Sequence, residues 1–186
     1  MKVPEAQVLQ AKKDMPRLEH AEFLATSPDD GDYNCVAWAL HRKDLHFWPA
    51  RAAFRARSAV TNRVRQVLYW PEDTDEESRE VFVRFFSMAV HGYHLLPTPD
   101  LSYQPGLDKI ALYLWSLDGQ VEHVARQLHD PSHPGWWTSK LGSAIDIVHR
   151  RAEDLLEERD ELVVMARQRR ASGWKSPLFP QPRKAR

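Results

Sequence analysis

The clearest pattern of apolar and polar positions lies between residues 74 and 92. Apolar side chains recur there at intervals of three and four, which is the spacing of the buried face of an α-helix: Val81, Phe82, Phe85, Phe86 and Ala89. Thr74 and Glu77 have the spacing of a capping box, and His91-Gly92 has the composition of a helix end. The sequence therefore predicts a helix from Thr74 to His91, with its phenylalanines in the core.

The periodicity changes at residue 108. Residues 109–116 (KIALYLWS) are almost continuously apolar, and residues 121–128 (VEHVARQL) alternate. Asp118-Gly119 between them is a strong signal for a tight hairpin. A second turn, rich in proline, leads into residues 136–142 (WWTSKLG). We predict an antiparallel meander of about three strands, in which the fully apolar first strand is central and covered on both faces.

Two short helices are expected nearer the N-terminus. Residues 4–14 (PEAQVLQAKKD) have the composition of one of them. The other follows the polar loop 27–32 and extends to about His41. Asp32 or Asn34 is suited to cap it, because a short polar side chain can accept a hydrogen bond from the first free N–H groups of a helix.

The C-terminal part of the chain is rich in charge. Residues 150–170 are expected to form a helix whose narrow apolar side would dock on the core or mediate self-association. Residues 43–71 are predicted to be irregular. We divide the chain into a helical segment at residues 1–22, an α+β domain at 23–150, a C-terminal helix at 151–170 and a mobile, basic, proline-rich tail at 171–186.

The composition excludes several classes of partner. Of the 186 residues 42% are hydrophobic, as in a globular protein, and 26 basic residues balance 26 acidic ones. No net field therefore favours nucleic acid or an anionic membrane. No apolar run approaches the ~20 residues that span a bilayer, and residues 1–20 lack the apolar core of a signal peptide. The single cysteine fits a reducing compartment, so we expect a cytoplasmic protein of open oligomeric state.

The single cysteine, Cys35, opens the second predicted helix in the stretch DYNCVAWAL. A helix N-terminus favours the thiolate through its partial positive charge and its unpaired N–H groups, so the sulfur becomes more nucleophilic. A cysteine nucleophile also needs a base, and His123 on the second strand of the meander is the best-placed histidine. A helix packed on the strand face that carries Val121, His123 and Ala125 would bring the thiol against the imidazole.

Four blocks of sequence occur in the order YNCVAWA, HVARQL, WTSKLG and DIVH between Phe23 and His149. Together they resemble a bacterial family of unknown function that has these blocks in this order. A helix-start cysteine followed by antiparallel strands, the second with a histidine, is also similar to the papain-like NlpC/P60 and CHAP amidases. The resemblance implies an α+β, papain-like fold in which the cysteine helix packs on an antiparallel sheet, with a C-terminal helix in addition.

Within this resemblance Cys35 falls on the nucleophile and His123 on the base. The third residue, which orients the imidazole, belongs on the next strand, where NlpC/P60 proteins usually have His, Asn, Gln or Glu. This sequence has Ser139 in that region instead. Ser139 is therefore one candidate for the orienting residue, and His149 or Asp146 in the block AIDIVH are the alternatives.

The same resemblance implies further residues around the nucleophile. Asn34 and the backbone N–H of Cys35 are the expected oxyanion donors, because amides at a helix start point to where a tetrahedral oxygen develops. Tyr33, Trp38 and Lys140 complete the expected binding residues. No cofactor is implied.

Two functions from different classes follow. The first is a cysteine hydrolase that cleaves a peptide, isopeptide or side-chain amide, or an acyltransferase if an amine replaces water. The second is a catalytically inert papain-like module that binds a peptide or a partner protein, with Cys35 as a small buried apolar residue. A zinc site is the least favoured reading, because His129 and His133 lie in a proline-rich turn without paired cysteines.

Overall fold

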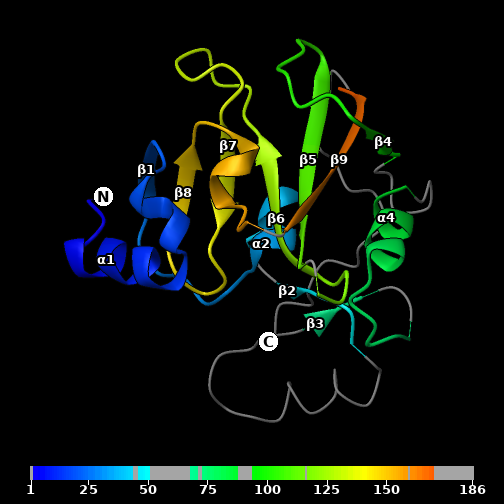
Figure 1. The fold of residues 1–186 in the computed structure, drawn as a ribbon, viewed down its shortest axis with the longest axis horizontal. Coiled ribbons are helices and arrows are strands. Elements are labelled where there is room, and N and C mark those ends of the chain that lie inside the picture. Colours follow the sequence, from blue (N-terminus) through cyan, green and yellow to red (C-terminus); the bar gives the residue numbers. More distant parts are fainter. Residues whose placement is uncertain are drawn as a thin grey trace, which may run out of the picture.

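The computed structural model describes residues 2–43, 46–50, 68–70, 73–87, 94–115, 117–158 and 160–169. Within them, one seven-stranded antiparallel sheet has the order β1-β8-β7-β6-β5-β9-β4 (Figure 1). Its strands are β1 (Phe23–Ser27), β4 (Leu96–Thr98), β5 (Leu107–Leu114), β6 (Val121–Gln127), β7 (Trp137–Lys140), β8 (Asp146–His149) and β9 (Glu161–Gln168). A small parallel pair joins β2 (His46–Phe47) to β3 (Leu68–Tyr69). The described chain is thus of the expected α+β class.

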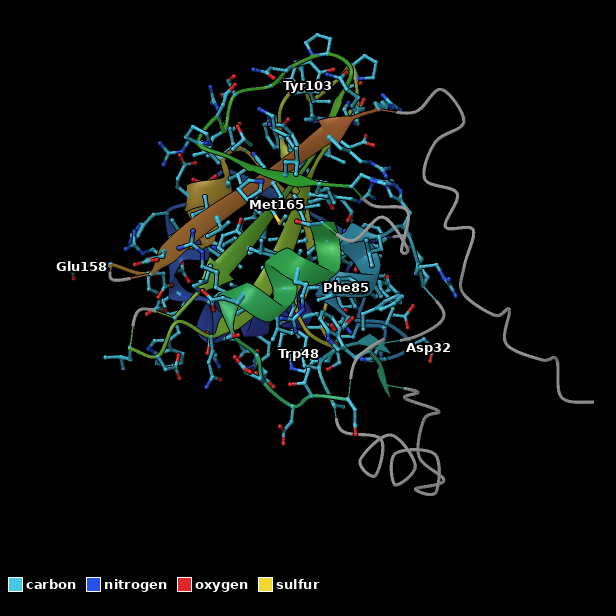
Figure 2. All side chains as sticks on the ribbon, turned by 90° about the vertical axis from the view of Figure 1, so that its right-hand side faces the viewer. Asp32, Trp48, Phe85, Tyr103, Glu158 and Met165 are labelled. Carbon is cyan, nitrogen blue, oxygen red and sulfur yellow. The ribbon has the colours of Figure 1, made fainter. Side chains whose placement is uncertain are left out.

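Each face of the large sheet carries its own hydrophobic cluster. On one face, which we call the α2 face, α2 (Cys35–Ala39) and α4 (Arg79–Ser87) pack against the sheet. On the other, the α1 face, the cover consists of α1 (Glu5–Asp14) and two 3₁₀ turns, η1 (Pro16–Glu19) and η3 (Ala152–Leu155). Figure 2 shows the sheet from its β4 end, with Glu158 and Asp32 on opposite sides of it.

The predicted meander is confirmed. β5 lies between β6 and β9 and is buried from Asp108 to Leu114, because both faces of the sheet are covered. Gly119 in the hairpin has a φ of 68°, a left-handed conformation that glycine adopts without a steric penalty. Asp118 Oδ1 accepts a hydrogen bond from Gln120 N and stabilises the same turn.

The predicted C-terminal helix is wrong. Residues 161–168 form β9, which pairs with β5 along its full length, from Leu107 opposite Gln168 to Leu114 opposite Glu161. Only η3, a short 3₁₀ turn, remains of the expected helix in the described residues. The charged sequence has a helical composition, but the N–H and C=O groups at the edge of β5 need partners in the core. The backbone of residues 161–168 supplies these partners. The apolar side chains from Leu162 to Met165 pack alternately into the clusters on the two faces of the sheet.

The predicted phenylalanine helix is confirmed, with a later start. α4 begins at Arg79, and Ser78 Oγ accepts from Val81 N at 3.5 Å. Thr74, the predicted cap, instead accepts from Glu76 N in a local turn. Val121 N, at the start of β6, donates a hydrogen bond to the Glu77 carbonyl. This bond holds the segment before α4 in an extended conformation. The predicted end at His91 lies outside the described residues, as does the tail 171–186.

Candidate functional site

Asn34 fixes the start of α2 through three hydrogen bonds of its side-chain amide. Its Oδ1 accepts hydrogen bonds from Ala37 N at 3.1 Å and from Phe47 N at 3.2 Å. Its Nδ2 donates to the Phe47 carbonyl at 2.8 Å. The prediction of Asn34 as a cap is confirmed, whereas Asp32 N only closes a turn with Asp30. These three contacts orient the amide and leave the second hydrogen of Nδ2 unused, so the role of Asn34 as an oxyanion donor stays a prediction.

Cys35 is the first residue of α2 and is buried, with 4% of its surface exposed. Its thiol lies beside β6, where the backbone N–H of Val124 donates a hydrogen bond to the sulfur. Burial raises the pKa of the thiol to about 11, and the backbone hydrogen bonds from Val124 and Val36 lower it only in part. At neutral pH Cys35 is therefore a protonated thiol, and the activation expected from its helix-start position is outweighed by burial.

His123 lies on the α1 face and not against Cys35. Its ring packs on Tyr113 with a centroid separation of 5.4 Å, and its Nε2 is buried without a hydrogen-bond partner. Burial and the nearby His149 lower the pKa of His123 to about 3, so the imidazole is neutral. The predicted thiol–imidazole contact is absent between these two described side chains.

A β-bulge explains the separation of Cys35 from His123. Tyr113 of β5 pairs with His123, but the next residue, Leu114, pairs with Val121. One extra residue of β6, Glu122, is thereby inserted, so the alternation of side chains is interrupted. Val121 and Val124 consequently join the cluster of the α2 face, while Ala125 and His123 lie on the α1 face. The assumption of unbroken alternation placed Val121 and His123 on the same face and was wrong.

The other two predicted catalytic residues accompany His123 on the α1 face. His149 Nδ1 lies 2.8 Å from the Arg151 carbonyl, so this nitrogen carries the proton, and Nε2 accepts from Ser139 Oγ at 3.1 Å. Burial lowers the pKa of His149 to about 4. His123, Ser139 and His149 thus occupy one side of the sheet, and Cys35 lies apart from them.

The predicted binding residues Tyr33 and Lys140 belong to a buried polar network on the α2 face. Tyr33 Oη donates to Asp146 Oδ2 at 2.8 Å, and Ser27 Oγ donates to the same oxygen at 2.5 Å. Lys140 Nζ lies 3.7 Å from Asp146 Oδ1, and it also donates to the Ala144 carbonyl. Burial lowers the pKa of Lys140 while the Asp146 carboxylate opposes that effect. These contacts tie the loop before α2 to β7 and β8, so they have a structural role.

Trp38 attaches α2 to the sheet. Its Nε1 donates to Thr138 Oγ1 at 3.0 Å, which connects the helix to β7. Two cations lie near its ring, Lys43 Nζ at 4.6 Å and the Arg126 guanidinium at 5.2 Å from the ring centroid. These cation–π contacts occupy the indole, which stacks on Tyr33 in addition.

A cavity of about 640 Å³ opens on the α1 face next to His123. Its lining comes from the end of α1 with η1, from the β5–β6 hairpin, and from the segment between η3 and β9: Asp14, Met15, Arg17, Tyr113, Leu114, Trp115, Leu117, Glu122, His123, Leu155, Glu157, Glu158 and Asp160. Glu158 stands at the outer edge of this side of the molecule in Figure 2. The sequence did not predict the cavity, because its acids come from segments far apart in the chain, and those of residues 157–160 fall within the predicted C-terminal helix.

No metal centre emerges from the described part of the chain, where no three metal-ligating side chains are grouped. The histidines weighed as zinc ligands have separate contacts: His129 with Asp108 at 3.1 Å, and His133 with Asp130 at 3.2 Å. None of the helices in the described ranges is long and apolar enough to cross a membrane.

The comparison with known families confirms one part of the resemblance. The model of a domain of unknown function, DUF7689, matches residues 24–160, and the chain belongs to this family. The match contains all four blocks from YNCVAWA to DIVH. No curated protein and no solved structure matches the chain.

Proposed function

We propose that this DUF7689 domain is a binding module for a peptide or partner protein, and that its binding site is the cavity beside His123. The observation that carries the proposal is the position of the His123 imidazole, which lines a 640 Å³ cavity on the face of the sheet away from Cys35. A concave site of this size that combines apolar side chains with polar groups is typical of ligand recognition.

The ionisation of the two predicted catalytic groups supports binding over catalysis. Cysteine hydrolases depend on a thiolate paired with an imidazolium. Here burial raises the pKa of Cys35 to about 11 and lowers that of His123 to about 3, so both groups are neutral at pH 7. Cys35 then serves as a small apolar residue at the junction of α2 and β6.

Nuclear magnetic resonance with a random nonapeptide library tests this proposal. Peptides that bind the ¹⁵N-labelled protein are expected to shift the amide signals of Trp115, Leu117 and Glu157 at the cavity. The signals of Trp38 and Lys43 on the opposite face serve as the internal control and are expected to stay in place. The absence of any binding peptide, or shifts confined to the surroundings of Cys35, would contradict the proposal.

A papain-like cysteine hydrolase is the second candidate, and one contact favours it. The N–H that donates to the Cys35 sulfur belongs to Val124, the residue directly after His123, so thiol and imidazole flank the same strand. If a shift of the bulge at Glu122 brought the His123 side chain to the α2 face, Cys35 would attack an amide carbonyl, and His123 would pass the thiol proton to the leaving amine. Water would then hydrolyse the thioester.

An electrophilic amide mimic distinguishes the two candidates. A peptide vinyl sulfone reacts with an activated cysteine and only slowly with a protonated one. The binding-module proposal predicts no labelling of Cys35 above that of the His123→Ala variant. Rapid labelling of the wild type that the His123→Ala variant loses would favour the hydrolase.

A further inference from the structure

We infer that the cavity beside His123 binds a positively charged side chain, the guanidinium of an arginine or the ammonium of a lysine, presented by a peptide or partner protein. This inference rests on the proposed binding function and specifies its ligand. It is carried by the charges of the cavity, by carboxylates that form no ion pair with a described residue, and by its apolar wall.

The described lining is strongly acidic. It contains five carboxyl groups and one guanidinium, that of Arg17, which gives a formal charge of 1 − 5 = −4 when all are ionised. The acids are Asp14, Glu122, Glu157, Glu158 and Asp160. They meet here from three separate segments of the chain, so their proximity is a product of the fold and not of a charged run in the sequence.

None of these five carboxylates forms an ion pair with a described residue. Elsewhere in the described chain exposed acids do find cations, as Glu19 does with Lys12 at 3.3 Å and Glu22 does with Arg150 at 2.7 Å. The carboxylates of the cavity repel one another instead: burial raises the pKa of Glu122, and the charges of Asp160 and Glu157 raise it further. A bound cation would relieve this repulsion.

His123 provides a second, independent indication of a ligand. The residue lines the cavity, is 8% exposed, and its Nε2 has no hydrogen-bond partner, although buried polar atoms are nearly always paired. Since its imidazole is neutral, it adds no positive charge that would repel a cation.

The apolar part of the wall suits the stem of an arginine or lysine side chain. Tyr113, Trp115, Leu117 and Leu155 line the cavity, and Trp115 and Leu117 are 46% and 76% exposed. Long basic side chains place their methylene groups on such surfaces and their charge among carboxylates. The Trp115 ring at the rim also offers an aromatic face for a cation. A bare metal ion would gain nothing from this wall, and no group of three ligands is present in the described residues.

Matched peptides test the inference. A nonapeptide with a central arginine, the same peptide with citrulline, and one with lysine are titrated into the protein by calorimetry, beside free arginine amide and spermidine. We expect the arginine and lysine peptides to bind at least tenfold more tightly than the citrulline peptide, which has nearly the same shape without the charge. Binding is expected to weaken at higher salt, since the attraction is between exposed charges. Free amines that bind as tightly as the peptides would overturn the assignment to a peptide chain.

Charge-neutral variants locate the effect in the cavity. Glu157→Gln and Glu158→Gln together are expected to weaken the arginine peptide about tenfold and to leave the citrulline peptide unchanged. Glu153→Gln and Glu161→Gln, exposed acids outside the cavity lining, are the matched controls and should change neither. Equal loss in both pairs of variants would overturn the inference.

The outcomes also separate this inference from the proposed function. Equal binding of the citrulline and arginine peptides, with amide shifts at Trp115 and Leu117, would overturn the charge preference and leave the binding module standing. Absence of binding by every peptide, together with vinyl sulfone labelling of Cys35, would overturn both.

Discussion

The Cys35 thiol accepts a hydrogen bond from the backbone N–H of Val124, at the edge of β6 where β7 no longer pairs with it. This hydrogen bond and the start of α2 both favour the thiolate, but the sulfur is buried between α2 and β6. Desolvation there disfavours the thiolate more strongly, and this is why a helix-start cysteine is not activated.

The pH dependence of alkylation follows from the burial of Cys35. Because burial raises the pKa of Cys35 to about 11 from an ordinary 9, the thiolate fraction at pH 7 is roughly a hundredfold below that of an ordinary thiol. Iodoacetamide alkylation of the folded protein should be slow at pH 7 and increase up to about pH 11. The reaction is followed by mass spectrometry. A rate that persists at pH 6, and that His123→Ala abolishes, would indicate a thiolate–imidazolium pair instead.

The two buried histidines of the α1 face should make stability depend on pH. Their folded pKa values, about 3 for His123 and about 4 for His149, lie below the ~6.5 of the unfolded chain. Below pH 6.5 the unfolded state binds more protons, so stability is complete above that pH and is lost as the pH falls to about 4 for His149 and about 3 for His123. The slope is up to about 1.4 kcal/mol per pH unit for each histidine.

Urea unfolding at pH 7 and pH 5 measures this effect. His123→Phe keeps the ring packed on Tyr113 but cannot be protonated, so the loss of stability between the two pH values should become smaller. His20→Asn, at an exposed position, is the control. An unchanged difference in the His123→Phe variant would show that His123 does not titrate on unfolding.

Asn34 is expected to contribute more to stability than an ordinary helix cap. Asn34→Ala removes the cap of α2 and both hydrogen bonds to Phe47, so the free energy of unfolding should fall by about 2 kcal/mol or more. Asp32→Ala should cost much less, because the Asp32 side chain does not cap α2 and the backbone turn at Asp32 is kept. Chemical denaturation provides the comparison, and equal losses would mean that the α2 cap is not the relevant contact.

Arg167 and Asp108 form a buried ion pair between β9 and β5. Arg167 Nε and Nη2 both donate to Asp108 Oδ2, at 3.2 and 3.1 Å. Arg167→Met leaves the carboxylate buried without its guanidinium partner, and we expect a loss of about 3–5 kcal/mol. The double variant with Asp108→Leu should recover most of that loss, because the uncompensated charge is gone. A double variant as unstable as the single one would point to packing instead of charge.

Local sequence signals determined the elements that stabilise themselves. The Asp118-Gly119 hairpin, the apolar β5, the phenylalanine face of α4 and the Asn34 cap depend on neighbours a few residues away, so residue spacing was sufficient to predict them. Ser139 and His149 were predicted only as alternative partners of His123, and their hydrogen bond to each other was not predicted, since the relative position of β7 and β8 is not a local property.

Only the tertiary structure decided which residues face one another. Residues 161–168 became a strand because β5 required a hydrogen-bonding partner, against the helical composition of the charged flanks. The bulge at Glu122 moved His123 to the face opposite Cys35, and a single inserted residue leaves no signature in the periodicity of so short a strand. The acidic cavity likewise arises where three distant segments meet, and the sequence shows each of them only as solvated charge.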